Sequence, residues 1–253
     1  MCSSDLIVPR FGWRGLFVVA AAPALLVLPI RAWVPESPEW KRQIARAHVS
    51  LRELARGGVA GRLVWASLAM AAGFGLYYGL TGLWPTLLAE LGRSDVARLV
   101  ALFNVGMLAG AVAIGGLAAR RGVGLALLLP VLLTLCALPI YVGYAPHLLW
   151  LGALAGGAFG GGICGVVPYL LTSMFAPAIR ARSVGLVYHA GAMVAAFVPT
   201  LIAALRDHAG LPLPRAMIVV TAVCGVALLA LLPLHRVMGS PADAQLDNRA
   251  VAH

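Results

Sequence analysis

Charge is what this sequence has least of. Only 11% of its 253 residues are charged, against roughly 25% in an average soluble domain. With 61% of residues hydrophobic and a mean hydropathy of +0.92, so few charges cannot cover the surface of a soluble core. The balance argues against a soluble enzyme, a disordered chain or a coiled coil. It predicts an all-α polytopic membrane protein.

Motifs for metal, phosphate or covalent chemistry are also missing. The four cysteines, Cys2, Cys136, Cys164 and Cys224, show no CxxC or Cys/His spacing, and no phosphate loop or nucleophile constellation is present. We therefore expect no catalytic residues, no cofactor and no metal. The net charge of +10 comes from basic residues scattered between apolar runs, without a basic stripe interleaved with aromatics. Cytoplasmic loops facing anionic lipid account for it better than nucleic acid does.

Runs free of Asp, Glu, Lys and Arg predict about seven transmembrane helices. They cover residues 15–30, 63–89, 99–119, 122–179, 183–205 and 216–235. The run 122–179 is too long for one helix and fits two. We place its break at 141–147, where glycine, proline and tyrosine cluster.

The basic residues predict the orientation of these spans. The loops 35–62, 120–121, 180–182 and 235–253 together carry twelve Lys and Arg, whereas the opposite loops carry four. Positive charge collects on the cytoplasmic side. The sequence thus predicts a multi-pass protein of the cell (inner) membrane whose carboxyl terminus, with a tail at 237–253, is cytoplasmic.

Two hydrophilic segments allow alternative interpretations. Residues 1–11 begin with MCSSDL, which reads like translated adapter DNA joined to a truncated gene. We expect the natural protein to continue upstream; a genuine short amino terminus is the alternative. In the segment 35–62, Ser37 and Pro38 suit a helix start, and apolar residues follow at helical spacing. This predicts an amphipathic helix on the cytoplasmic leaflet, with a solvated linker as the alternative.

Three patterns in order resemble the major facilitator superfamily. The segments GWRGLF at 12–17 and VPESPEW at 34–40 resemble its sixth span and the loop that follows. The segment GGLAARRGV at 115–123 resembles its G-x-x-x-D-R-x-G-R loop, with Ala119 and Val123 in place of Asp and Arg. Residues 167–191 resemble the junction between its tenth and eleventh spans, with Ser173 and Ala176 in place of Glu and Pro.

The resemblance covers about residues 12–236. It implies a span-six-like helix at 12–34 and a six-helix C-terminal transporter half at 63–236. Members have two six-helix halves around a central cavity that opens to either side in turn, so the missing N-terminal half would be a partner. The segment YYGLTGLWPTLL at 77–88 is similar to the metabolite:proton symporter group that includes sialate and lactate permeases. Sugar porters share several of these features.

Candidate substrate-binding residues cluster in the second span. Tyr77, Thr81 and Trp84 would share one face of a helix. Pro85 has no N–H for the Thr81 carbonyl, and a broken helix with free carbonyls suits a polar ligand. Lipid-facing or packing aromatics are the alternative.

Further candidates are more isolated. Asn104 could bind a ligand, although joining helices is the favoured reading, and Tyr169 follows the kink-forming Pro168. No span interior holds Asp, Glu, Lys or Arg, so within this fragment only His189 or Glu90 could couple protons. The alternative is that the coupling carboxylate belongs to the missing half, and a structural role for His189 is favoured.

Four residues at cytoplasmic helix ends are candidates for a gating loop: Arg120, Gly122, Arg180 and Arg182. Positive-inside anchoring explains the arginines equally well.

The sequence as a whole predicts secondary active transport of a small organic solute by alternating access, here as a fragment. A carboxylate carried with protons is the favoured solute. The alternatives are a sugar-porter-like carrier, a membrane-embedded enzyme or assembly subunit, and a non-functional gene fragment.

Overall fold

A computed structural model describes residues 58–175 and 177–238, together with residues 12, 14–15, 17–19 and 21–33. Contacts divide the chain into two units, Met1–Val49 and Ser50–His253. The expectations for residues 1–11, for the amphipathic helix within 35–62 and for most of the tail at 237–253 fall outside the described residues.

The first unit contains one apolar helical segment, Phe17–Trp33. Within it, a 3-10 turn, η1 (Ala22–Leu26), leads into α2 (Val27–Trp33). At about 1.5 Å per residue, seventeen residues reach roughly 26 Å, slightly less than the ~30 Å hydrocarbon core. The predicted run at 15–30 coincides with this helix.

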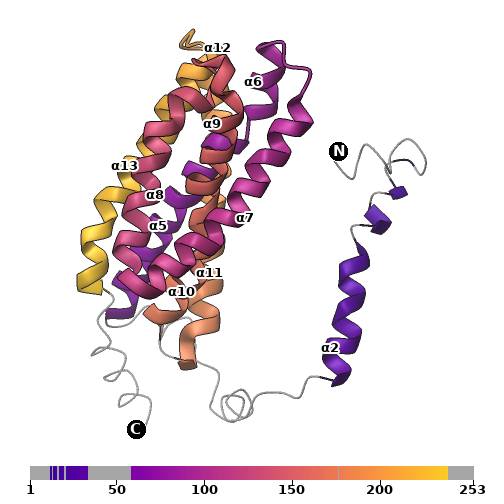
Figure 1. Ribbon diagram of the computed structural model, residues 1–253. Coiled ribbons are helices and arrows are strands. Elements are labelled where there is room, and N and C mark those ends of the chain that lie inside the picture. The colour runs from indigo at the N-terminus through magenta and orange to yellow at the C-terminus, as the bar shows by residue number, and fades with distance from the viewer. Residues whose placement is uncertain are drawn as a thin grey trace. The chain divides into compact units, whose positions relative to one another are not determined.

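Six helices of the second unit are long and apolar enough to cross a membrane, among the residues that the structure describes. They run side by side as one bundle (Figure 1). The spans are Val59–Glu90, Val96–Arg121, Val123–Tyr141, Pro146–Met174, Ile179–Asp207 and Leu213–Pro233. Each matches a predicted apolar run, and the long run divides at 141–147 as expected. The predicted all-α polytopic class is confirmed.

Several spans are built from more than one helix. The first comprises α5 (Gly58–Thr81) and α6 (Trp84–Glu90), and the fifth comprises α11 (Pro177–Ala195) and α12 (Val198–Asp207). The second, third and sixth are the single helices α7 (Val96–Arg121), α8 (Val123–Tyr141) and α13 (Leu213–Met238). Prolines near the start of α6 and α12 remove backbone donors, which explains why the helices break there.

The fourth span is the most irregular. A short turn, η2 (Pro146–Leu148), opens it, followed by α9 (Leu149–Ala155), the π-helical η3 (Gly156–Gly161), the 3-10 turn η4 (Gly162–Gly165) and α10 (Val167–Met174). The sequence GGAFGGGICG runs through η3 and η4. Glycine weakens a helix interior by about 1 kcal/mol per residue relative to alanine, so this stretch leaves the regular α-helix easily.

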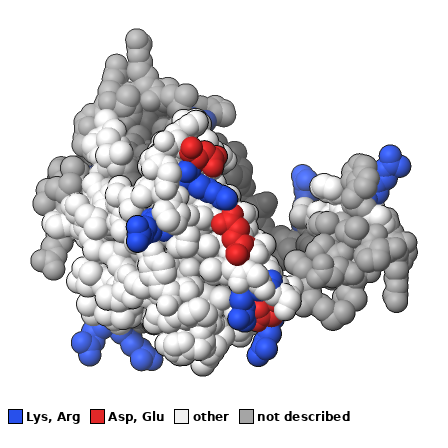
Figure 2. Space-filling view, turned by 90° about the horizontal axis from the view of Figure 1, so that it is seen from above, with Lys and Arg blue, Asp and Glu red and all other residues white. Residues whose placement is uncertain are grey.

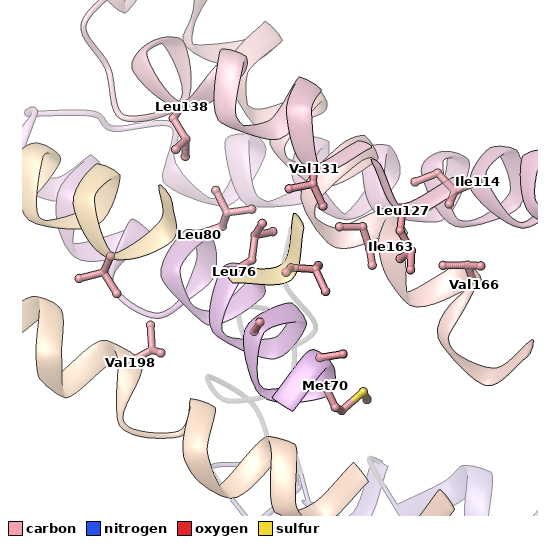
Figure 3. Close-up of a cluster of buried hydrophobic side chains, with 14 of the residues drawn as sticks. Met70, Leu76, Leu80, Ile114, Leu127, Val131, Leu138, Ile163, Val166 and Val198 are labelled. Atoms are coloured by element: carbon pink, nitrogen blue, oxygen red, sulfur yellow. The ribbon is translucent and has the colours of Figure 1, made fainter. Parts of the chain in front are cut away.

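Helix α5 lies at the centre of the bundle. It packs against α11 and α13, and its Leu76 and Leu80 are buried among side chains of α8 and η4, including Val131 and Ile163 (Figure 3). Lipid is as apolar as leucine, so close packing rather than exclusion from water holds such helices together.

Glycines let α7 and the fourth span touch backbone to backbone. A Cβ on Gly110 would collide with the carbonyl oxygen of Ala158, and one on Gly157 would collide with that of Phe103. Gly106 and Gly110 of α7 therefore allow this helix to pack closely against the fourth span.

The two broken spans meet at their breaks. A Cβ on Gly82, between α5 and α6, would lie 2.7 Å from Cγ of Pro199 in α12. Farther out, Arg206 Nη1 and Glu90 Oε1 form an ion pair of 2.6 Å. Seen from the α6 and α12 end, several acidic side chains lie close to basic ones, and other basic side chains stand apart on a surface that is mostly uncharged (Figure 2). The segments α6 and α12 are thus in contact both at the helix breaks and at the Glu90–Arg206 ion pair.

Candidate functional site

A cavity of about 280 Å³ lies among α5, α11, α13 and the irregular fourth span, whose η4 and α10 form one wall. Its wall contains no charged side chain among the residues the structure describes. Only four lining side chains carry a polar group: Trp65, Tyr77, Cys164 and Tyr188. The indole N–H of Trp65 already donates to the carbonyl of Leu231 at 3.0 Å. Two phenols and one thiol remain for a ligand.

The local sequence explains why space is left here. Gly73 lines the cavity, and a Cβ built on it would meet nothing within 4 Å. Across the cavity, η4 passes into α10 at Pro168, which has no N–H for the carbonyl of Cys164 four residues earlier. A missing side chain on one wall and a break in the other leave the gap.

Aromatic rings line the same wall. The ring of Tyr188 stands edge-on to that of Phe74, with centroids 5.0 Å apart. Tyr188 is 47% exposed at the open side of the cavity, where Cys164 and Pro168 are also exposed. The hydroxyls of Tyr77 and Tyr188 form no hydrogen bond within the described part of the chain. They are free to bind a ligand.

The structure separates the three residues predicted to share a face. Tyr77 lines the cavity, and Thr81 donates its hydroxyl to the Tyr77 carbonyl at 2.9 Å. Trp84 is only 2% exposed and packs in the core, away from the cavity lining. The reason is the interruption at Gly82 and Leu83: Trp84 begins a new helix, so the spacing of a continuous helix does not place it.

The carbonyl of Leu80, which precedes the break, has a partner. The Tyr141 hydroxyl donates to it at 2.9 Å, and the Trp84 indole N–H donates to the Tyr141 carbonyl at 3.2 Å. Polar backbone groups inside a bilayer need such partners.

The remaining candidates lie outside the cavity lining. Asn104 is exposed on α7 and donates to the Val100 carbonyl at 2.9 Å, and Tyr169 is 59% exposed on α10. His189 is exposed, and its Nδ1 lies 2.7 Å from the Gly185 carbonyl. Nδ1 must donate in that contact because a carbonyl only accepts. The His189 ring lies 5.9 Å from that of Tyr188, so it stands near the mouth of the cavity.

Two curated transporters are similar to this chain. The sialic acid transporter NanX of Escherichia coli is 28% identical over 214 residues, which cover 81% of this chain and 53% of that protein. The cis,cis-muconate transport protein of Acinetobacter baylyi is 28% identical over 222 residues, covering 79% and 52%. Both similarities support the resemblance to transporters of the major facilitator type. It spans about half the length of the curated relatives it matches. No family model matches it, and no solved structure does.

The predicted gating residues lie at two helix junctions. Gly122 alone separates α7 from α8, with φ +87° and ψ 160°, a conformation essentially restricted to glycine. Arg120 is exposed in the last turn of α7. Arg180 donates from Nε to the Phe175 carbonyl at 3.2 Å, across the junction of α10 and α11, and Arg182 is exposed on α11.

Among the predicted site residues only Tyr77 lines the cavity, so sequence reasoning missed the rest of its wall, including Trp65, Phe74 and Cys164. A signal for part of the wall was present, because Ala66, Met70, Gly73 and Tyr77 recur at intervals of three and four along α5. Such a stripe marks one helix face. It does not tell a cavity wall from a packed core, so only the arrangement of the neighbouring helices revealed it.

Proposed function

We propose that this chain forms part of a secondary active transporter that moves a small organic acid across the membrane by alternating access. The cavity at the irregular fourth span is the single observation that supports this most directly. It is an uncharged space enclosed by helices that are candidate membrane spans. Non-helical backbone at membrane depth is typical of transporter sites. The two relatives, named for sialic acid and muconate, support an organic acid as the solute.

In this proposal, residues 63–236 act as one six-helix half and a second six-helix half is the partner. The greater length of the relatives supports such a partner. The protein would reside in the inner membrane with its carboxyl terminus in the cytoplasm, in keeping with the excess of basic residues on that side.

The proposed roles follow position. Tyr77 would contact the solute in the cavity, Thr81 and Trp84 would hold the broken first span in shape, and Asn104 and Tyr169 would contact solute from exposed faces. His189 would relay protons near the mouth. Arg120, Gly122, Arg180 and Arg182 would form the cytoplasmic gate.

Uptake by cells that express the complete reading frame encoding this chain tests the proposal. We expect accumulation of a labelled acid from a panel of sialate, lactate, muconate and sugars, and loss of that accumulation with a protonophore. His189→Gln should reduce accumulation at least tenfold, whereas His208→Gln, an exposed histidine just after α12, should not. No uptake of any solute, or hydrolytic activity in its place, would overturn the proposal.

A further inference from the structure

We infer that the cavity holds the carbon chain of an acid with few or no hydroxyl groups, and that polyhydroxylated acids are excluded from it. The inference rests on the proposed function only for the idea that the ligand is a carried solute. The binding itself stands on the composition of the cavity wall.

The cavity wall offers few free polar groups to a ligand. After Trp65 has donated to Leu231, the side chains of the wall offer only the hydroxyls of Tyr77 and Tyr188 and the thiol of Cys164. A buried hydroxyl without a partner costs about 1–3 kcal/mol. A sugar acid with five hydroxyls would leave several of them unpaired, while an unsubstituted chain would leave none.

The size and lining of the cavity favour a short apolar body. Its volume of about 280 Å³ falls just below the ≈ 300–1,000 Å³ of typical ligand pockets. The rings of Trp65, Phe74, Tyr77 and Tyr188 present apolar faces and edges to the space. Gly73 leaves open the volume that any larger residue would fill.

The charge of the acid belongs at the mouth. No described lining residue is a cation, and an unpaired carboxylate inside an apolar wall is very costly. At the exposed side, the ring of Tyr188 lies 5.9 Å, between centroids, from the ring of His189, whose Nδ1 donates to the Gly185 carbonyl. The Tyr188 hydroxyl can donate to a carboxylate there, and Nε2 of His189 can donate to it only in the imidazolium form, because Nδ1 carries the proton of the neutral ring.

Protection of Cys164 from alkylation tests this inference in the full 253-residue chain reconstituted in liposomes. Hexanoate and gluconate are the probes, because both are six-carbon monocarboxylates and differ in their hydroxyl groups. Saturating hexanoate should slow the reaction of Cys164 with N-ethylmaleimide at least fivefold, and gluconate should leave it unchanged. Cys136, which is exposed outside the cavity lining, is the internal control, read in the same mass spectrum.

Besides an absence of protection by hexanoate, three results would overturn the inference: equal protection by gluconate, protection by hexyltrimethylammonium, or protection by 1-hexanol as strong as that by hexanoate. The second would indicate a site for organic cations on the aromatic rings. The third would indicate an apolar site that does not recognise the acid.

Variants test the geometry by direct binding of radiolabelled hexanoate. Gly73→Leu should lower affinity at least tenfold by filling the cavity. Gly124→Leu should leave affinity unchanged, because Gly124 also has open space at its Cβ but lies outside the lining. Tyr188→Phe should weaken binding about 2- to 10-fold, the range expected for one hydrogen bond of ≈ 0.5–1.5 kcal/mol, whereas the exposed loop variant Tyr144→Phe should not. Wild-type affinity in Gly73→Leu would sink the assignment.

Failure of this inference and failure of the proposed function are distinguishable. Cys164 protection without uptake in cells would keep the site and remove transport. Uptake of an acid that does not protect Cys164 would keep transport and place the solute elsewhere.

Discussion

The indole ring of Trp84 stacks on the phenol ring of Tyr141, with centroids 4.6 Å apart and planes inclined by 14°. Both side chains also donate hydrogen bonds to backbone carbonyls near the helix break. The Trp84 indole N–H donates to the Tyr141 carbonyl, and the Tyr141 hydroxyl donates to the Leu80 carbonyl. The pair links the α5–α6 break to the end of α8. It stabilises an irregular backbone that the bilayer would otherwise penalise.

Removing this pair should destabilise the bundle. We expect Trp84→Ala to cost about 3–5 kcal/mol, as for other buried aromatic truncations, and Tyr141→Phe about 1–3 kcal/mol, because the Leu80 carbonyl loses its donor. Denaturant unfolding in mild micelles measures both. Trp150→Ala, at an exposed position, is the control and should stay within about 0.5 kcal/mol of wild type.

The glycine contact between α7 and the fourth span should not tolerate a methyl group. Gly110→Ala would push Cβ against the Ala158 carbonyl, so the helices must separate. We expect a loss of about 1–3 kcal/mol or more. Gly116→Ala, also on α7 but with open space at its Cβ, should be neutral or slightly stabilising. Equal unfolding midpoints for the two variants would contradict the packing described.

The one-residue turn between α7 and α8 depends on glycine. Gly122→Ala forces an L-residue to φ +87° and should cost about 1–3 kcal/mol. Arg120→Ala, two residues earlier and exposed, should change stability by less than about 0.5 kcal/mol. If Arg120→Ala reduces transport while stability holds, the gating role is supported.

The ion pair between Glu90 and Arg206 should couple the outer segments α6 and α12 weakly. Both side chains are roughly two-fifths exposed, at 39% and 44%. A double-mutant cycle with Glu90→Gln and Arg206→Gln should give a coupling of about 0.2–1 kcal/mol. It should shrink as salt rises to 1 M, where the Debye length is about 3 Å. A coupling independent of salt would argue against a direct charge interaction.

The Arg93–Asp95 pair in the loop before α7 should make a small contribution to stability that is lost in acid. The hydrogen bond from Arg93, helped by its charge, lowers the pKa of Asp95 below its ordinary value of 3.8. A group with a lowered folded-state pKa stabilises the fold above its unfolded pKa and loses that contribution as pH falls through the folded one. The stability difference between wild type and Asp95→Asn should therefore be constant above about pH 5 and vanish in stronger acid. Unfolding midpoints across pH 2–7 measure it.

The sequence by itself determined the membrane class, the positions of the apolar spans, the break at Pro85 and the break at 141–147, but not the breaks at α11–α12 or within the fourth span. Hydropathy and the chemistry of proline are local properties. Pro85 therefore predicted the α5–α6 break, and the cluster at 141–147 predicted the end of α8.

Only the tertiary structure decided which side chains face the cavity. Helical spacing placed Tyr77 and Trp84 on one face, but that spacing holds only along an unbroken helix. The break at Gly82 and Leu83 leaves Tyr77 on the cavity wall and turns Trp84 into the core. Cys164 and Gly73 come from different spans, and their meeting around one space depends on how the helices pack. Local sequence patterns determine which segments cross the membrane. Packing between distant segments determines which side chains surround the cavity.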